Sequence, residues 1–233
     1  MREFTYYIFN LLVFLPVLIL SFLTDVKPHR HIRGLLAGYL LVSLPFILWD
    51  IWAVSAGHWG FNDTYVTGPY LFNVPLEEYL FFLTVPFALI YVWGVIKKFV
   101  VDRSMAGIVP LLLFGTAAGV SVWMLINYWS NGYTRSAAIA TLIAVLVAVV
   151  SRIAYTWRFW TFQLVLLGLF LVFNSILTML PIITYGPDAI IGFRIGDIPI
   201  EDFFFNFAFA NLFLIVYTTI DQPRLIKTLN IQK

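Results

Sequence analysis

Residues 75–82 read PLEEYLFF, and residues 199–206 read PIEDFFFN, which is the same pattern 124 residues further along the chain. The correspondence extends outward without a gap, so that Gly68 falls on Gly192. Self-similarity at a fixed distance is the signature of a duplicated structural unit. The sequence therefore predicts two related halves, each carrying a proline followed by a pair of carboxyl groups.

The composition predicts a membrane protein. Of the 233 residues, 61% are hydrophobic and 11% are charged, less than half of the roughly 25% that is usual in soluble domains. The mean hydropathy is +0.91. A net charge of +2 argues against nucleic-acid binding, which needs several phosphate contacts. The absence of cysteine excludes disulfides, thiolate nucleophiles and iron–sulfur clusters, and three dispersed histidines do not suggest a metal site.

We expect an all-α fold with seven transmembrane helices, because seven apolar runs approach the roughly 20 residues that cross a bilayer. These runs lie near Phe4–Leu23, Gly34–Val54, Leu76–Ile96, Met105–Tyr128, Ala137–Tyr155, Trp160–Pro181 and Ile200–Ile220. The first run has no small-residue cleavage site, so we interpret it as a permanent span and not as a signal peptide. The fifth is short and is bounded by Arg135 and Arg152.

The repeat and the helix count together predict a 3+1+3 arrangement. We expect a first three-helix repeat in residues 1–100, a linker helix in residues 101–130 and a second repeat in residues 131–233. Two consecutive three-helix units would insert upside down relative to each other, whereas one extra span makes them parallel. Both acidic motifs should therefore lie on the same face of the membrane.

Two G-x-x-x-G spacings occur, Gly34 with Gly38 and Gly115 with Gly119. This spacing allows close helix approach, although in so apolar a chain simple packing is the commoner explanation.

The basic residues predict the orientation in the cell membrane. Eleven lysines and arginines fall in the loops after the first, third and fifth helices and in the C-terminal tail, against three on the other side. Cytoplasmic loops carry the excess of such residues. We therefore expect the N-terminus outside and the C-terminus in the cytoplasm.

The acidic pairs have a structural and a functional interpretation. Proline in a first turn followed by a carboxylate is a common helix start. An ionised carboxylate inside a span, however, costs about 2.5–3.5 kcal/mol, so duplicated pairs favour function. Neighbouring positions differ by about 100° around a helix, so one carboxyl of each pair can face the bundle interior while the other supports it. The candidate catalytic residues are Glu77, Glu78, Glu201 and Asp202.

Polar and aromatic side chains surround these candidates. Three polar residues are candidate supports: Asp50, Asn174 and Asn206. The first two are related by the repeat. Aromatic faces stabilise a nearby cation by up to about 2 kcal/mol where water is excluded, although phenylalanine is equally ordinary packing surface. The candidate substrate-contacting rings are Tyr79, Phe81, Phe82, Phe203, Phe204 and Phe205.

The doubled motif on three-helix units resembles the small integral-membrane lycopene cyclases, which occur as two-subunit bacterial enzymes, as single-chain fusions and as a domain of fungal bifunctional carotenoid enzymes. The resemblance covers essentially the whole chain. It implies cyclisation of the linear ends of lycopene to β-rings, giving γ-carotene and β-carotene. It also implies that the four motif carboxyls are catalytic. The second copy has aspartate at Asp202 and asparagine at Asn206, which leaves open whether both copies act.

The implied chemistry fits the residues. Ring closure needs a general acid, stabilisation of a cation and a general base, with no net redox change. The chain has no G-x-G-x-x-G fingerprint, so we expect no cofactor. The implied partners are lycopene and other linear carotenes, membrane lipid and other carotenoid enzymes. We expect one composite site, in which Glu77→Gln or Glu201→Gln alone nearly abolishes cyclisation.

Other functions have weaker support. A parallel 3+1+3 small-molecule transporter shares the topology, and a carotenoid hydratase would use the same cation. A retinal-binding photoreceptor needs a lysine in a late helix, and the last three predicted spans contain none. A prenyltransferase needs several aspartates for magnesium, whereas Asp63 stands alone in its loop.

Overall fold

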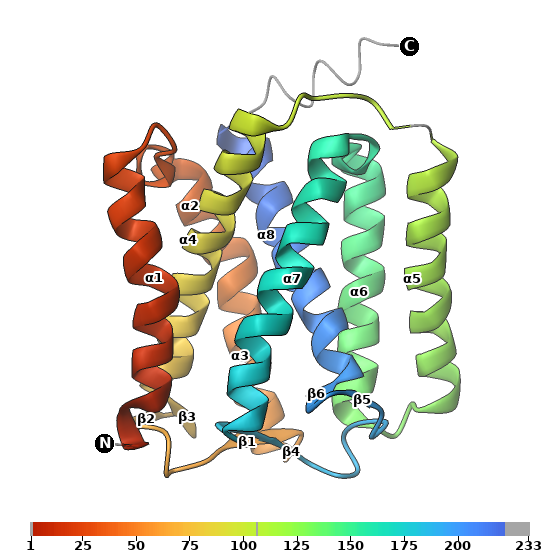
Figure 1. The fold of residues 1–233 in the computed structure, drawn as a ribbon. Coiled ribbons are helices and arrows are strands. Elements are labelled where there is room, and N and C mark those ends of the chain that lie inside the picture. Colours follow the sequence, from red (N-terminus) through yellow and green to blue (C-terminus); the bar gives the residue numbers. More distant parts are fainter. Residues whose placement is uncertain (1, 106, 222–233) are drawn as a thin grey trace.

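The computed structural model describes residues 2–105 and 107–221. Within them, seven helical spans are long and apolar enough to cross a membrane, and they form one bundle (Figure 1). This arrangement confirms the predicted all-α transmembrane fold. The helical segments are η1 (Arg2–Phe4), α1 (Thr5–Leu23), η2 (Pro28–Arg30), α2 (Ile32–Gly38), η3 (Tyr39–Ser43), α3 (Leu44–Ser55), α4 (Leu76–Phe99), α5 (Ile108–Asn127), α6 (Gly132–Ser151), η4 (Ile153–Tyr155), α7 (Trp157–Met179) and α8 (Ile200–Asp221).

The fifth span begins earlier than predicted, at Gly132, and so includes Arg135. The guanidinium of Arg135 lies 5.3 Å from the centre of the Trp129 ring and donates a hydrogen bond to the Trp129 carbonyl oxygen at 3.2 Å. A long basic side chain near a helix end can reach the membrane interface in this way. The arginine therefore does not end the span, contrary to the expected boundary at Ala137.

The second span is continuous but contains a π-helical turn, η3, between α2 and α3. Pro45 follows this turn and has no N–H to continue the α-helical hydrogen bonds. A single wide turn accommodates the missing donor. It also brings the Ser43 hydroxyl to 3.1 Å from the carbonyl oxygen of Phe82 on α4.

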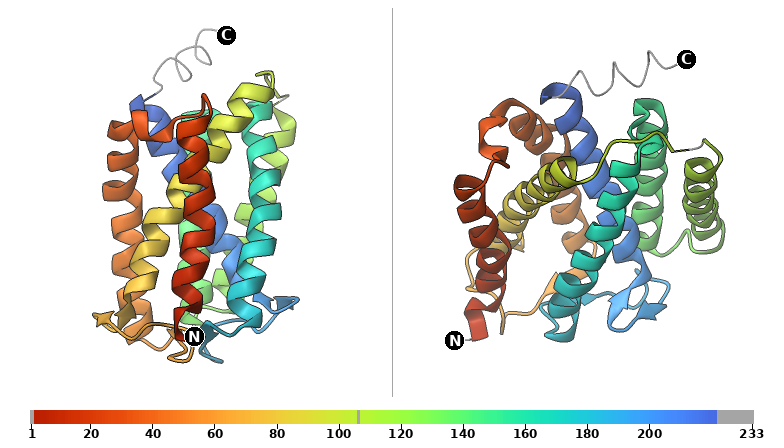
Figure 2. Two further views of the ribbon diagram at one scale, coloured as in Figure 1. Left: turned by 60° about the vertical axis from the view of Figure 1, so that its left-hand side comes forward. Right: turned by 45° about the horizontal axis from the view of Figure 1, so that its top comes forward.

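The two repeats are parallel and exchange their middle helices. In each repeat the outer helices pack together, α1 on α4 and α6 on α8. The middle helix crosses to the other half, so that α2 packs on α8 and α7 on α4 (Figures 1 and 2). Helices α4 and α8 both begin at the end of the bundle where the strands lie, as predicted (Figure 1).

The loops before α4 and α8 pair with each other over that end of the bundle. Strand β1 (Trp59–Phe61) pairs with β4 (Ile183–Tyr185) in antiparallel register. Gly60 lies opposite Thr184, its own counterpart 124 residues away. The approximate two-fold axis that relates the repeats therefore passes between these two residues. Each loop then makes a short hairpin: β2 (Tyr70–Leu71) with β3 (Val74–Pro75), and β5 (Arg194–Ile195) with β6 (Ile198–Pro199).

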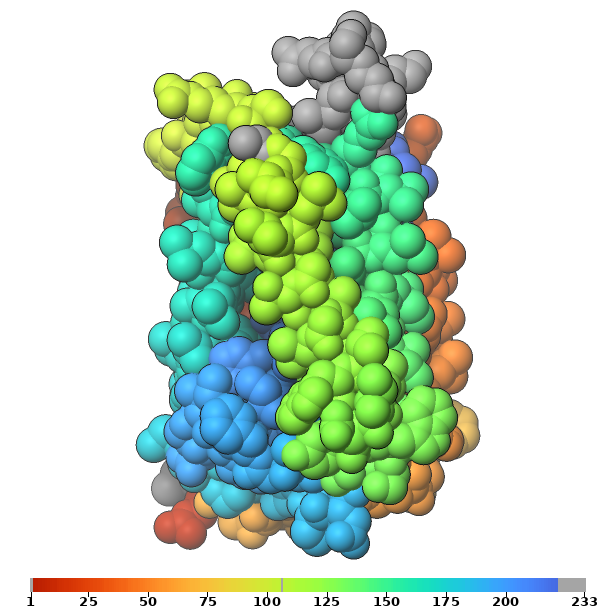
Figure 3. Space-filling view, turned by 90° about the vertical axis from the view of Figure 1, so that its right-hand side faces the viewer, coloured from red at the N-terminus to blue at the C-terminus, as the bar shows by residue number. Residues whose placement is uncertain are grey.

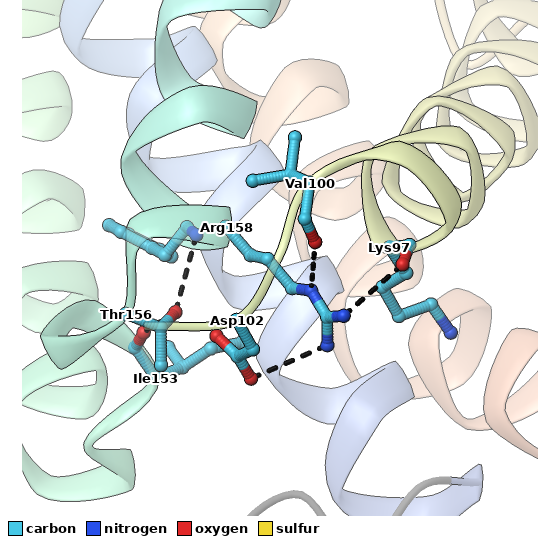
Figure 4. A network of polar contacts seen from close by, with 7 residues as sticks. Lys97, Val100, Asp102, Ile153, Thr156 and Arg158 are labelled. Atoms are coloured by element: carbon cyan, nitrogen blue, oxygen red, sulfur yellow. Dashed lines mark hydrogen bonds and ion pairs between the residues drawn. The ribbon is translucent and has the colours of Figure 1, made fainter. Parts of the chain in front are cut away.

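The opposite end is fastened by a polar network between α4 and α7 (Figure 4). The Arg158 guanidinium donates hydrogen bonds to the carbonyl oxygens of Val100 and Lys97, at 2.9 and 3.2 Å. It also forms an ion pair with Asp102 at 3.4 Å. The first turn of α7 is capped by the Thr156 hydroxyl. The contact joins the third helix of one repeat to the second helix of the other.

The two G-x-x-x-G spacings differ in the structure. A Cβ atom on Gly34 would lie 2.3 Å from a carboxylate oxygen of Asp221, and one on Gly38 would lie 2.6 Å from the Phe213 ring. These two glycines therefore permit the close approach of α2 and α8. A Cβ on Gly115 or Gly119 would meet nothing within 4 Å.

Candidate active site

The carboxyl groups of Asp50, Glu78 and Asp202 face a cavity of about 90 Å³ that lies between the repeats, beneath the paired loops. Both halves of the chain line it. The lining residues are Tyr6, Asp50, Trp59, Glu78, Phe81, Val85, Tyr133, Phe170, Asn174, Leu177, Ile183, Tyr185, Asp202, Phe205, Asn206 and Phe209. Three carboxyl groups in a mostly apolar chamber are costly unless they serve chemistry.

Glu78 supplies the first repeat's carboxyl to the cavity. The Tyr6 hydroxyl on α1 donates a short hydrogen bond to its Oε2 atom. Asp50, in the middle of α3, lines the same cavity and accepts a hydrogen bond from the indole nitrogen of Trp59 at 2.8 Å. Its second oxygen is buried without a hydrogen-bond partner among residues 2–105 and 107–221. The first repeat thus presents two carboxyls with few donors.

Asp202 supplies the second repeat's carboxyl, in richer surroundings. Its Oδ1 accepts a hydrogen bond from the Tyr133 hydroxyl at 2.7 Å. Its Oδ2 accepts from Tyr185 at 2.6 Å and from the amide nitrogen of Asn174 at 2.8 Å. Three donors converge on one carboxyl, an arrangement that suits a negative charge.

Tyr185 lies on β4, outside the membrane spans, and its pKa is raised well above the ordinary value by burial and then by the nearby Asp202 carboxylate. The phenol therefore remains protonated through the physiological range and keeps donating to Asp202. The Glu78 carboxyl raises this pKa as well. Tyr185 is thus electrostatically linked to both carboxyls.

Glu77 and Glu201 do not line the cavity. The Oε1 atom of Glu77 accepts hydrogen bonds from the backbone nitrogen and the hydroxyl of Thr67, at 2.7 and 2.6 Å. The Oε1 atom of Glu201 accepts from the backbone nitrogen of Ile191 at 2.7 Å and from Thr134 at 2.6 Å.

Each of these two glutamates therefore fastens the loop that precedes its own helix. Adjacent helical positions point about 100° apart, so only the second carboxyl of each pair reaches the cavity. Of the four carboxyls expected to be catalytic, Glu78 and Asp202 line the cavity, whereas Glu77 and Glu201 do not.

The predicted polar supports all line the cavity: Asp50, Asn174 and Asn206. Of the predicted rings, Phe81 and Phe205, which are repeat counterparts, do so as well. Phe82 stands behind the lining and packs edge-on against Phe209 at 5.5 Å.

Three predicted rings lie elsewhere. The Tyr79 hydroxyl donates to the carbonyl oxygen of Leu71 in the loop at 2.8 Å. Phe203 and Phe204 line a groove on the outer side of α8. Tyr79, Phe203 and Phe204 therefore do not line the cavity.

Sequence reasoning missed the four aromatic donors, Tyr6, Trp59, Tyr133 and Tyr185. The repeat offered no signal for them, because Tyr6 corresponds to Ser130 and Tyr133 to Phe9. The two tyrosines are placed on α1 and α6 in different registers and yet reach equivalent carboxyls. A search for polar aromatic residues in each first helix would have found them.

Comparison with curated proteins and with solved structures gives no match. The family model described as lycopene cyclase matches residues 3–96 and again residues 127–220. The two matches cover both three-helix repeats and leave out the linker helix α5. Since they span most of the sequence, the chain belongs to the lycopene cyclase family.

Proposed function

We propose that the protein is a lycopene β-cyclase in which a carboxyl of one repeat donates a proton to the substrate and a carboxyl of the other repeat removes one. The observation that carries the proposal is the single cavity into which Glu78 and Asp202 both project, from opposite repeats and with different hydrogen-bond partners. A site built from two repeats explains why the chain carries both in parallel orientation.

The reaction is an isomerisation. Glu78 donates a proton to the terminal double bond of the linear end, which leaves a tertiary cation. The next suitable double bond attacks this cation, so that a new carbon–carbon bond closes the six-membered ring and the charge moves into the ring. Asp202 removes a ring proton and the β-ring double bond forms. One proton enters the substrate and one leaves it, with no net oxidation or reduction, and return of the proton from Asp202 to Glu78 restores the site for the next turnover.

The division between acid and base follows from the partners of each carboxyl. Glu78 lines the cavity together with Asp50, whose second oxygen is buried without a donor in the described part of the chain. Buried carboxyls with so few donors are best accommodated in the protonated form. Asp202 accepts from three donors and is arranged to hold negative charge.

The aromatic rings that line the cavity suit the cationic intermediate. Phe81 of the first repeat and Phe205 of the second repeat both line the cavity, and so do Phe170 and Phe209. Ring faces attract a cation by up to about 2 kcal/mol when water is absent. A cyclase must also keep water from the cation, because capture of the cation by water would give the product of a hydratase.

The test is expression of this chain alone in lycopene-producing cells, followed by separation of the pigments. We expect γ-carotene and β-carotene. Purified protein in lipid should convert lycopene without added flavin or reductant. A requirement for reduced flavin would contradict the proposed mechanism, ε-rings would contradict the ring type, and a hydroxylated linear carotene would identify a hydratase.

We also propose the orientation and the domain limits stated above. The paired loops and the cavity would lie at the non-cytoplasmic end. Three of the eleven basic residues that predict this, Arg224, Lys227 and Lys233, lie outside the described residues. Single cysteines at the exposed loop positions Asp63 and Asp188 should both be labelled from outside intact cells. Labelling only after permeabilisation would reverse the orientation.

A further inference from the structure

The cavity is too small for a linear carotene. Its volume is about 90 Å³, whereas an engineered cavity of about 150 Å³ holds one benzene molecule. Only the reacting end of the substrate can enter, and only with some movement of side chains. The rest of the polyene must leave the cavity by a route between helices.

The first repeat closes the corresponding route with hydrogen bonds. The Ser43 hydroxyl donates to the carbonyl oxygen of Phe82 at 3.1 Å, and the Tyr39 hydroxyl donates to the carbonyl oxygen of Leu83 at 2.9 Å. Both bonds join the second span, at η3, to α4. The seam between these two helices is therefore fastened at the level of the cavity.

Within the described residues, the second repeat lacks the counterparts of these two hydrogen bonds, and the bonds that join its α7 to α8 lie on either side, from Gln163 to Asn211 and from Asn174 to Asp202. Leu167 stands where the first repeat has Ser43, and it is exposed. Gln163 stands where the first repeat has Tyr39, and it donates to Asn211 at 2.8 Å, on the next turn of α8. In the described structure neither residue reaches the carbonyl of Asn206 or Phe207.

A ring pair takes the place of the missing bonds. Phe170 on α7 and Phe203 on α8 meet edge to face, with ring centres 4.9 Å apart. Phe170 lines the cavity, and Phe203 lines the groove on the outer side of α8. The two rings therefore form the partition between the cavity and the groove, and rotation of these side chains would connect the two spaces.

The groove is larger than the cavity and almost wholly apolar. Its volume is about 320 Å³, and it lies between α5, α6 and α8. Figure 3 shows the surface hollowed between α7 and α5, with α8 at the base. Phe114 of α5 closes one end, with ring contacts to Trp160 at 5.3 Å and Phe207 at 6.3 Å. Helix α5 has no counterpart in the first repeat, so the groove exists on one side only.

We propose that the unreacted polyene chain of a linear carotene passes between α7 and α8, beside Phe170 and Phe203, and lies in the groove between α5 and α8. This inference rests on the proposed function. A single exit admits one end of the substrate at a time. The second ring then requires release and reinsertion of the molecule, so the monocyclic carotene is a free intermediate.

The test fills the groove with a tryptophan on α5. Ala117→Trp places the indole in the groove, while the matched control Gly115→Trp, on the opposite face of α5, points into open space. Each variant is assayed with lycopene and with a truncated linear apocarotenoid that has the same reactive end. The same two substitutions are also made in Glu78→Gln protein, and the lycopene that remains bound after purification is measured by absorbance.

We expect Ala117→Trp to lower lycopene turnover by about tenfold or more, as overfilling an apolar site does. It should also lower the bound lycopene and spare the truncated substrate, which shows that the protein is folded. Gly115→Trp should match the parent in every assay. The proposed role of the groove would be overturned if Ala117→Trp left lycopene turnover and binding unchanged, or if it lowered the turnover of both substrates equally. If the unmodified protein cyclises nothing but bound lycopene still falls in Ala117→Trp, the proposed function fails and the groove stands.

Discussion

The two repeats share a frame but differ in the chemistry that they bring to the cavity. Glu78 has one tyrosine donor and a carboxyl neighbour, Asp50, whereas Asp202 has three donors and an amide neighbour, Asn174. The neighbours Asp50 and Asn174 are themselves repeat counterparts. Duplication therefore supplied two equivalent positions, and the differences at those positions are the basis of the proposed division between acid and base.

The largest expected effect comes from removing either carboxyl. Glu78→Gln and Asp202→Asn should each lower cyclisation by about 10²–10⁴-fold, the usual contribution of a general acid or base. The amides keep the volume but neither donate an acidic proton nor accept one. Product formation from lycopene, at matched amounts of folded protein, measures the effect.

This pair of variants also tests the comparison itself. If each repeat contained a complete site, each single variant would retain about half the activity and only the double variant would be inactive. Near-normal turnover in both single variants would therefore refute the shared site.

The second prediction tests the difference in hydrogen-bond donors, of which Asp202 has three and Glu78 has one. Tyr185→Phe removes one of three donors to Asp202. A hydrogen bond to a charged group contributes about 1.5–3 kcal/mol, and two donors remain, so we expect a loss of about tenfold. Tyr133→Phe should behave alike. An effect of Tyr185→Phe as large as that of Asp202→Asn would mean that Tyr185 itself transfers the proton.

The pH profile provides a control for that variant. Because the pKa of Tyr185 is raised, the phenol remains protonated, and the donor remains present, up to and beyond its ordinary value of about 10. The alkaline limb of the activity profile should therefore be the same in the parent and in Tyr185→Phe. A limb that disappears in the variant would show that Tyr185 titrates within the measured range.

The repeats also differ in how the middle helix of each packs against the other repeat, and this difference gives a third prediction. Gly38 on α2 meets the Phe213 ring of α8, whereas its counterpart Phe162 on α7 packs edge-on against Trp93 of α4 at 5.7 Å. Gly38→Ala should destabilise the protein by about 1–3 kcal/mol, the cost of overpacking. Gly119→Ala, which meets nothing, is the matched control. Thermal unfolding in detergent measures both, and equal midpoints would show that α2 and α8 can move apart freely.

The repeat made most of the fold predictable from the sequence. The matching motifs begin the third and the seventh spans, so the chain crosses the membrane four times between them, and an even number of crossings places both motifs on the same face. The sequence could not show which carboxyl of each pair faces the cavity, because that depends on the rotation of α4 and α8 set by packing. It also could not place Tyr6 or Tyr133, which break the repeat and reach their carboxyls only through the packing of α1 on α4 and α6 on α8.

The smallest expected effect is that of Glu77→Gln, and its comparison with Glu78→Gln distinguishes the roles of these two adjacent residues. The glutamine carbonyl oxygen can keep both hydrogen bonds from Thr67. Its amide nitrogen replaces Oε2, which is buried without a hydrogen-bond partner within the described residues. No charge-bearing group is removed from the cavity, so turnover should fall by less than about tenfold, against about 10²–10⁴-fold for Glu78→Gln.

Glu77→Ala gives the matched contrast. It deletes the acceptor and leaves the Thr67 N–H unpaired, at a cost of about 1–3 kcal/mol, so its loss should appear first in thermal stability and then in activity. Glu201→Gln and Glu201→Ala should repeat this pattern through Ile191 and Thr134. If Glu77→Gln instead lost as much turnover as Glu78→Gln while its unfolding midpoint stayed unchanged, Glu77 would act on the substrate, and the loop-fastening role inferred from its contacts would be wrong.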